Sequence, residues 1–352
     1  MGLKKLLWLV IALASSAGLA RANGISYTCD PNIDSLGPAN TCATLNTTIA
    51  GLYGSTFSNA NASIYIQYGI TGLGQSTSGF LNLVPYNTYL NALKAEGGPG
   101  VVRTDAINSL PLAEPALYIG GQIEVTSALG AALGLSSLVG TFADGTACFT
   151  PGSGGCYNGI ITITTPANLS AETGGTQFLY YRTGAQGANA YDFFSVVQHE
   201  TDEVLGTSSC VVTSGATLAE GCPLTTTNAS AVDLFRYQGA GTRVFVSTTP
   251  GAYFSYNGGV TNGADGAFYN TLSNGNDYAD FTTHCQHLQD AVGCLGGSFD
   301  LTNDGGPEIN ILDAVGYNLI ATTPEPGTLL LLGAGSAALS LYRRRRGSSL
   351  KM

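Results

Sequence analysis

The chain is 352 residues long, only 10% of its residues are charged, and its formal net charge is −10. A chain so poor in Lys and Arg lacks the basic surface that nucleic-acid binding requires, so we exclude that class of function. Its 48 Gly residues, together with frequent Ser, Thr and Asn, are typical of exported, strand-rich proteins and not of cytosolic enzymes.

The N-terminus predicts a secretory signal peptide over residues 1–22. Lys4 and Lys5 precede an apolar run, residues 6–19, and the Ala-Arg-Ala sequence at 20–22 fits the small-residue cleavage rule. An uncleaved anchor helix is the alternative, but the apolar run is short for a membrane span and a cleavage site follows it directly. The mature chain is therefore expected to begin at Asn23.

The body of the protein, residues 23–321, is expected to form one α+β domain. Its predicted elements follow from period-2 alternation in strands and period-3.6 spacing in helices. In chain order they are a strand at 62–69, a helix at 87–95, a strand at 120–126, a helix at 127–135, a strand at 160–165, a helix at 191–205, strands at 232–237, 242–248 and 252–256, and a helix at 308–320. Strands before the central helix, and loops with a further helix after it, are typical of an α+β fold.

The central helix carries a candidate metal motif, His-Glu-Thr-Asp-Glu at 199–203. On a helix His199 and Glu203 lie one above the other on the same face, so both can ligate one metal ion. Glu200 beside them can then act as a general base toward water. This is the HExxH layout of zinc proteases with Glu in place of the second His. An amphipathic helix that carries these residues by chance is the alternative, and Asp202 is expected to face solvent.

A catalytic zinc site needs a third protein ligand, because such sites offer three ligands and one open position. Asp233 follows the motif and is one candidate, although it could instead cap a strand. His287, in the sequence THCQH, is the other. A surface histidine in a loop is the alternative interpretation of His287.

Cysteine usage predicts an oxidising compartment. The eight Cys fall into close pairs, and with the exported context this favours four local disulfides, although spacing alone leaves the connectivity open. None of the pairs has the C-x-x-C spacing of a zinc site. The pairs are Cys29 and Cys42, Cys148 and Cys156, Cys210 and Cys222, and Cys285 and Cys294.

Two acidic loops, residues 274–280 and 300–306, have oxygen-rich sequences that could bind calcium. Neither fits the EF-hand pattern, and ordinary Asx turns are the alternative.

The C-terminus, residues 322–352, predicts a sorting segment. Pro324, Glu325 and Pro326 precede an apolar run, residues 328–341, and an Arg block follows at 343–346. This order resembles the PEP-CTERM signal of Gram-negative bacteria, in which an exosortase recognises Pro-Glu-Pro and removes the tail. The resemblance implies transient anchoring in the inner membrane and delivery to the cell surface or extracellular matrix. An ordinary tail anchor, which would keep its helix, is the alternative.

The body also resembles secreted bacterial metalloprotease-like proteins that carry PEP-CTERM tails. Besides the motif helix, the resemblance rests on the segments at 109–111, 131–135, 191–193, 233–237 and 311–317. It implies a disulfide-bonded, zincin-like α+β domain and a zinc-dependent peptidase that acts on proteins or peptides. The longer metzincin pattern is not kept, because Ser209 stands where its third His would be. A non-catalytic surface or biofilm-matrix protein with a degenerate zincin fold is therefore the alternative function.

Overall fold

The computed structural model describes residues 24–79, 83–98, 100–112, 121–211, 229–272, 277–303 and 306–320. The chain divides into two compact units, residues 1–319 and residues 320–352. The predicted signal peptide and the sorting segment lie outside the described residues. Among the residues that are described, none forms a helix long and apolar enough to cross a membrane.

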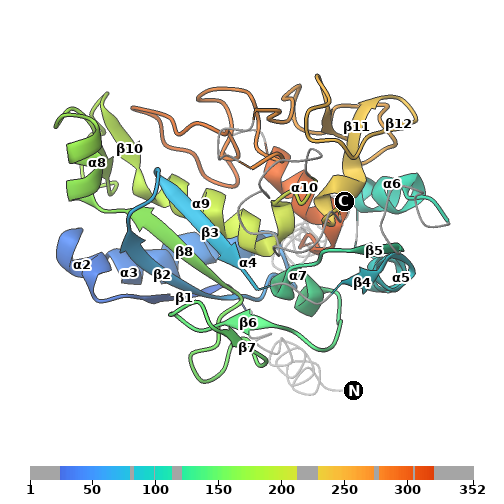
Figure 1. Ribbon diagram of the computed structural model, residues 1–352, viewed down its shortest axis with the longest axis horizontal. Helices are drawn as coiled ribbons and strands as arrows, with labels where there is room; N and C mark the ends of the chain where they lie inside the picture. Colours follow the sequence, from blue (N-terminus) through green and yellow to red (C-terminus); the bar gives the residue numbers. More distant parts are fainter. Residues whose placement is uncertain are drawn as a thin grey trace, which may run out of the picture. The chain divides into compact units, whose positions relative to one another are not determined.

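A four-stranded sheet with the order β1-β2-β8-β3 forms the centre of the body (Figure 1). The first three strands are parallel, whereas β3 runs antiparallel to β8 and lies at the edge. Ile161 in β8 pairs with Ile66 on one side and with Ser76 in β3 on the other. The strands are β1 (Ser26–Cys29), β2 (Ser63–Gly69), β3 (Gly74–Ser78) and β8 (Gly159–Thr164).

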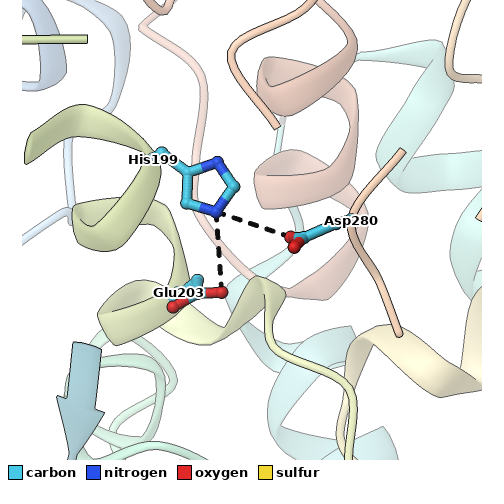
Figure 2. A group of neighbouring side chains, drawn as sticks. All are labelled: His199, Glu203 and Asp280. Atoms are coloured by element: carbon cyan, nitrogen blue, oxygen red, sulfur yellow. Dashed lines mark ion pairs between the residues drawn. The ribbon is translucent and has the colours of Figure 1, made fainter. Parts of the chain in front are cut away.

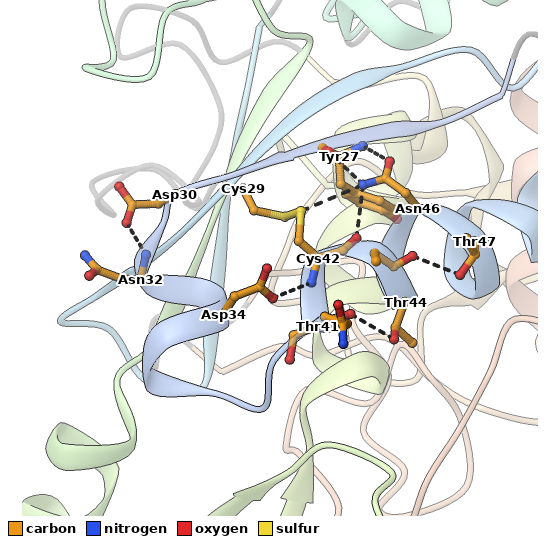
Figure 3. The surroundings of a disulfide bond; sticks show 12 residues. Tyr27, Cys29, Asp30, Asn32, Asp34, Thr41, Cys42, Thr44, Asn46 and Thr47 are labelled. Atoms are coloured by element: carbon orange, nitrogen blue, oxygen red, sulfur yellow. Dashed lines mark hydrogen bonds between the residues drawn. A yellow bond between two sulfur atoms is a disulfide. The ribbon is translucent and has the colours of Figure 1, made fainter.

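Short helices after β1 cover one side of the sheet, and a disulfide ties them to it. The Cys29–Cys42 bond joins the end of β1 to α3, while Asn46 exchanges two 2.9 Å hydrogen bonds with the backbone of Tyr27 (Figure 3). The Asn46 side chain thus pairs with β1, which has one strand neighbour, β2, within the described part of the chain. These helices are α2 (Asn32–Leu36), α3 (Thr41–Thr44), the π-helical turn η1 (Leu45–Ile49) and α4 (Ala50–Thr56).

The predicted central helix is present as α9 (Phe193–Asp202), which continues into a π-helical turn, η3 (Glu203–Thr207). Asp192 begins the helix because its carboxylate accepts hydrogen bonds from the amides of residues 194 and 195. Gly206 ends it with a φ of 117°, a conformation that favours glycine. The helix lies between the sheet and the segment 277–303, which is drawn in orange in Figure 1.

The face of α9 away from its candidate ligands is fixed by N-terminal tyrosines. Tyr53 donates a 2.6 Å hydrogen bond to Asp202, and the Tyr27 hydroxyl lies 3.0 Å from that of Thr201. Asp202 is fully buried, so the expectation that it faces solvent was wrong. Tertiary packing by the N-terminal helices, which the local pattern does not reveal, covers this side of α9.

The remaining elements agree with the predicted types where the apolar pattern is strong. The helix expected at 87–95 is α5, but the strand expected at 232–237 begins as a 3-10 turn, and that at 242–248 contracts to two residues. The last helix stops at Val315 because Gly316 has a φ of 150°. These elements are β4 (Val84–Pro85), α5 (Tyr86–Glu96), α6 (Val101–Ser109), β5 (Gln122–Ile123), α7 (Ser127–Ala132), β6 (Gly140–Thr141), β7 (Ala147–Cys148), α8 (Pro166–Glu172), β9 (Phe178–Tyr180), β10 (Ala190–Asp192), η4 (Val232–Phe235), β11 (Arg236–Gly239), β12 (Thr242–Arg243), β13 (Tyr253–Phe254) and α10 (Pro307–Val315).

The body contains both helices and strands and is cross-linked by disulfides, which agrees with the predicted α+β class. Disulfides join Cys29 to Cys42, Cys148 to Cys156 and Cys285 to Cys294, as the pairing of neighbouring cysteines predicted. Cys210 is also disulfide-bonded, and Cys222 lies outside the described residues.

Candidate metal centre

Three potential metal ligands meet where α9 passes into η3. One ligand atom from each of His199, Glu203 and Asp280 lies within 4.8 Å of the others (Figure 2). His199 Nε2 is 3.8 Å from Glu203 Oε1 and 3.5 Å from Asp280 Oδ1. Both spacings exceed the about 2.7–3.2 Å of an N–H···O bond. Two ligands bound at about 2.1 Å to a tetrahedral zinc ion lie about 3.4 Å apart, which is close to what is found here.

The imidazole of His199 is oriented by the loop opposite the helix. Its Nδ1 atom lies 2.9 Å from the carbonyl oxygen of Leu288. A carbonyl oxygen can only accept, so Nδ1 carries the proton and donates it. In the neutral ring, the lone pair of Nε2 then faces the two carboxylates, which is the tautomer that a metal ligand requires.

Glu203 is held from the other side by the edge strand. Its Oε2 atom accepts a 2.6 Å hydrogen bond from the Ser76 hydroxyl in β3. This bond leaves Oε1 to face His199. The two candidate ligands His199 and Glu203 are therefore each oriented by a hydrogen bond to another residue. Such supporting hydrogen bonds are common in metal sites.

Asp280 is the candidate ligand whose carboxylate lacks a hydrogen bond at one oxygen. Its side chain is buried, and Oδ1 has no hydrogen-bond partner. Burial raises the pKa of Asp280 well above its usual range, and the nearby carboxylates of Glu203 and Asp277 raise it further. Buried carboxylates that crowd one another are stable as anions only beside a cation. A divalent metal ion among these three ligands would supply that charge.

Asp277 supports the same segment without joining the ligand group. Its carboxylate accepts hydrogen bonds from the amides of Ser209, at 2.9 Å, and Ala279, at 2.6 Å. Burial and the charge of Glu203 raise the pKa of Asp277, and the two amides oppose that shift. These bonds tie the segment before Asp280 to the chain that leaves η3.

Glu200, the predicted general base, lies beside the ligands in a shared cavity of about 590 Å³. The cavity runs along α9 between β3 and the loop at 287–294, and Glu200, His199, Glu203 and Asp280 all line it. The Glu200 side chain is 5% exposed and packs against Gly74 of β3. The cavity therefore brings Glu200 and the three candidate ligands to one space, and Glu172, Asp192, Asp277 and Asp290 also line it.

The structure places Asp233 outside the ligand group. Its carboxylate accepts hydrogen bonds from the Ser209 hydroxyl at 2.6 Å, the Cys210 amide at 2.9 Å and the Ser230 amide at 2.8 Å. Asp233 thus fixes the chain after η3, and Asp280, not Asp233, lies beside His199 and Glu203.

His287 lines the cavity, but it is not part of the ligand group either. Its side chain is buried, and its ring stands edge-on to that of Phe281 with the centroids 5.6 Å apart.

Sequence reasoning did not name Asp280 as a candidate ligand, although the sequence held one signal for it. It ends the acidic loop at 274–280, whose oxygen-rich sequence predicted a cation of another kind. In the second acidic loop, Asp300 Oδ1 accepts 2.7 Å hydrogen bonds from Arg182 and Gln198. Calcium binding by either loop stays a prediction.

Comparison with known proteins bears on the tail. Residues 322–346 match the family model of the PEP-CTERM protein-sorting motif. The chain is thus an exported bacterial protein that an exosortase sorts to the cell surface, as Pro324, Glu325 and Pro326 predicted. No curated protein and no solved structure matches the chain.

Proposed function

We propose that the body is a zincin-like, zinc-dependent peptidase that is exported and sorted to the cell surface. His199, Glu203 and Asp280 hold the metal, and Glu200 is the general base. The observation that carries this proposal is the convergence of one ligand atom each from His199, Glu203 and Asp280, together with the buried Oδ1 of Asp280 that has no hydrogen-bond partner. His and carboxylate ligands are those that zinc accepts in catalytic sites.

Zinc bound there would supply Lewis-acid chemistry toward water and the scissile carbonyl. The chain itself supplies the proton transfers. Glu200 lies one residue from His199 in the same cavity, so its carboxylate can take a proton from the attacking water. Protonated Glu200 can then give that proton to the departing amine.

A peptide substrate suits the border of the cavity. Among the described residues, β3 has a strand neighbour on one side only, and its residues 74–76 line the cavity. An extended peptide can add to such an edge by backbone hydrogen bonds. It would then lie beside Glu200 and the three ligands.

The test is metal content by plasma mass spectrometry together with peptidase activity on a mixed peptide library. We expect about one zinc ion per purified chain, lost in His199→Ala, and hydrolysis that a chelator abolishes. Glu200→Gln should keep its zinc while its hydrolysis falls about 10²- to 10⁴-fold, the usual contribution of a general base. A parent protein that takes up no zinc, and whose Glu200→Gln variant behaves as the parent does, would instead support the non-catalytic surface protein.

A further inference from the structure

We propose that the Cys285–Cys294 disulfide assembles the metal site, so that metal affinity depends on its oxidation. This inference rests on the proposed metal site and adds a condition for its formation. The disulfide closes a loop with a sequence separation of 9, and the loop contacts two of the three ligand segments.

The first contact is with His199. Leu288, inside the loop, accepts the 2.9 Å hydrogen bond from Nδ1 that orients the imidazole. The next residue, Gln289, donates a 3.0 Å hydrogen bond from its side chain to the carbonyl oxygen of His199. The loop therefore holds both the ring and the backbone of this ligand.

The second contact is with the segment of Asp280. Phe281, the next residue, donates a 2.8 Å backbone hydrogen bond to Gln289 and accepts a 2.9 Å bond from Ala291. The Gln289 amide also donates a 3.0 Å bond to the buried Glu308 in α10. Gln289 and its neighbours thus link α9, the Asp280 segment and α10.

The disulfide closes a loop that has no regular secondary structure of its own. No helix or strand is assigned to the described residues between Phe254 and Pro307. Inside the loop, the Asp290 carboxylate accepts the amides of Gln286, at 2.9 Å, and His287, at 3.2 Å. Without the covalent link, hydrogen bonds alone must keep the loop in this conformation. They are opposed by the conformational entropy that the open chain would gain.

Reduction would break the S–S bond. A dithiol reductant gives two electrons and two protons, the two cysteines become thiols, and the reductant becomes a disulfide. The bacterial cytoplasm keeps thiols reduced, whereas the compartment beyond the inner membrane permits disulfides. The site therefore reaches its full metal affinity only after export, when the disulfide has formed.

The experiment compares two double variants of the full chain. Cys285→Ser with Cys294→Ser opens the proposed loop. Cys148→Ser with Cys156→Ser opens a loop of similar length, with a separation of 8, and none of residues 148–156 lines the cavity. Zinc affinity is measured by competition with a chromogenic chelator, and the absorption spectrum of bound Co²⁺ reports ligand geometry.

We expect the first variant to bind zinc at least about tenfold more weakly, the scale seen when residues that orient metal ligands are lost. Its Co²⁺ spectrum should change, whereas the control variant should match the parent in both measurements. Equal affinities in all three proteins would overturn the inference. A parent that binds no zinc would overturn the proposed function instead.

A second measurement uses the parent protein, so it does not depend on the folding of a variant. Coupling is reciprocal, so zinc must protect the Cys285–Cys294 bond against reduction by the same factor. The two loops are followed by thiol alkylation and mass spectrometry, with and without zinc. Protection of Cys285–Cys294 but not of Cys148–Cys156 is expected, and equal reduction of both bonds with and without zinc contradicts the inference.

Discussion

Gly74 in β3 lies directly against Glu200 in α9, with no room for a side chain between them. A Cβ atom on Gly74 would stand 3.0 Å from Cδ of Glu200 and 2.6 Å from Cγ1 of Val196. The backbone of Gly74 has no positive φ, so this position calls for glycine because of space. Contact with Gly74 in the edge strand β3 therefore sets the position of the Glu200 carboxylate in the cavity.

We predict that Gly74→Ala reduces hydrolysis about tenfold or more while the bound zinc is kept. The added methyl group must displace Glu200 or Val196, and small displacements of catalytic groups have large effects on rate. Overpacking should also lower stability by about 1–3 kcal/mol. Rate, metal content and thermal unfolding together test this. Gly239→Ala is the control, because no atom would lie within 4 Å of the added Cβ; equal rates in both variants would contradict the prediction.

Asp280→Asn should weaken zinc binding by about 100-fold or more. The variant keeps the shape of the side chain but removes a negative ligand, leaving His199 and Glu203. Without metal, the same variant should be more stable than the parent at neutral pH, because burial disfavours the charged form of Asp280. Chelator competition measures the first effect and calorimetry the second. Asp105→Asn in α6 is the matched control and should change neither quantity.

Zinc affinity should rise with pH. The pKa of Asp280 is raised well above its usual range, so the metal-free protein holds a proton there that zinc must displace. Below that pKa, affinity should rise about tenfold per pH unit for each proton released. Calorimetric titrations at pH 5, 6 and 7, in buffers of different ionisation enthalpy, give both the affinity and the protons released. An affinity independent of pH over this range would contradict the release of a proton from Asp280 when zinc binds.

A buried ion pair far from the cavity should make stability depend on pH. Arg103 in α6 lies 3.4 Å from Asp313 in α10, and both side chains are buried. Burial raises the pKa of Asp313 from 3.8 to about 6, although Arg103 opposes the shift. The folded state thus holds the proton more tightly than the unfolded state does. Its contribution to stability is complete below pH 3.8 and is lost as pH rises through about 6.

This is tested by urea unfolding of the metal-free protein between pH 4 and pH 7. Asp313→Asn cannot titrate, so its stability should fall less steeply over that range than the parent's. Identical slopes for the two proteins would contradict the assignment.

The parts of the fold that could be predicted are those with a strong local signal. The apolar β-branched sequence of β8 indicated a strand, and the helical spacing of apolar residues over 191–205 indicated the helix that forms α9 and η3. The strand β3 was missed because its sequence, GQSTS, has no apolar residue and is held by backbone pairing with β8. The 3-10 turn η4 replaced an expected strand because Asp233 turns back to accept the Ser230 amide.

Of the three candidate ligands, His199 and Glu203 could be predicted because they lie four residues apart in the sequence. Asp280 could not, because it comes from a distant loop and one Asp among many carries no local mark. What identifies it is burial beside Glu203 and an oxygen with no hydrogen-bond partner, and both depend on tertiary structure.

The end of the body has a mechanical consequence for sorting. Leu319 forms a β-bridge with Phe57, and the Ser58 amide donates a 2.8 Å hydrogen bond to Asn318. The sorting motif begins a few residues later, at residue 322. A pulling force on the tail would therefore act first on the pairing of residues 318–319 with residues 57–58, next to α4.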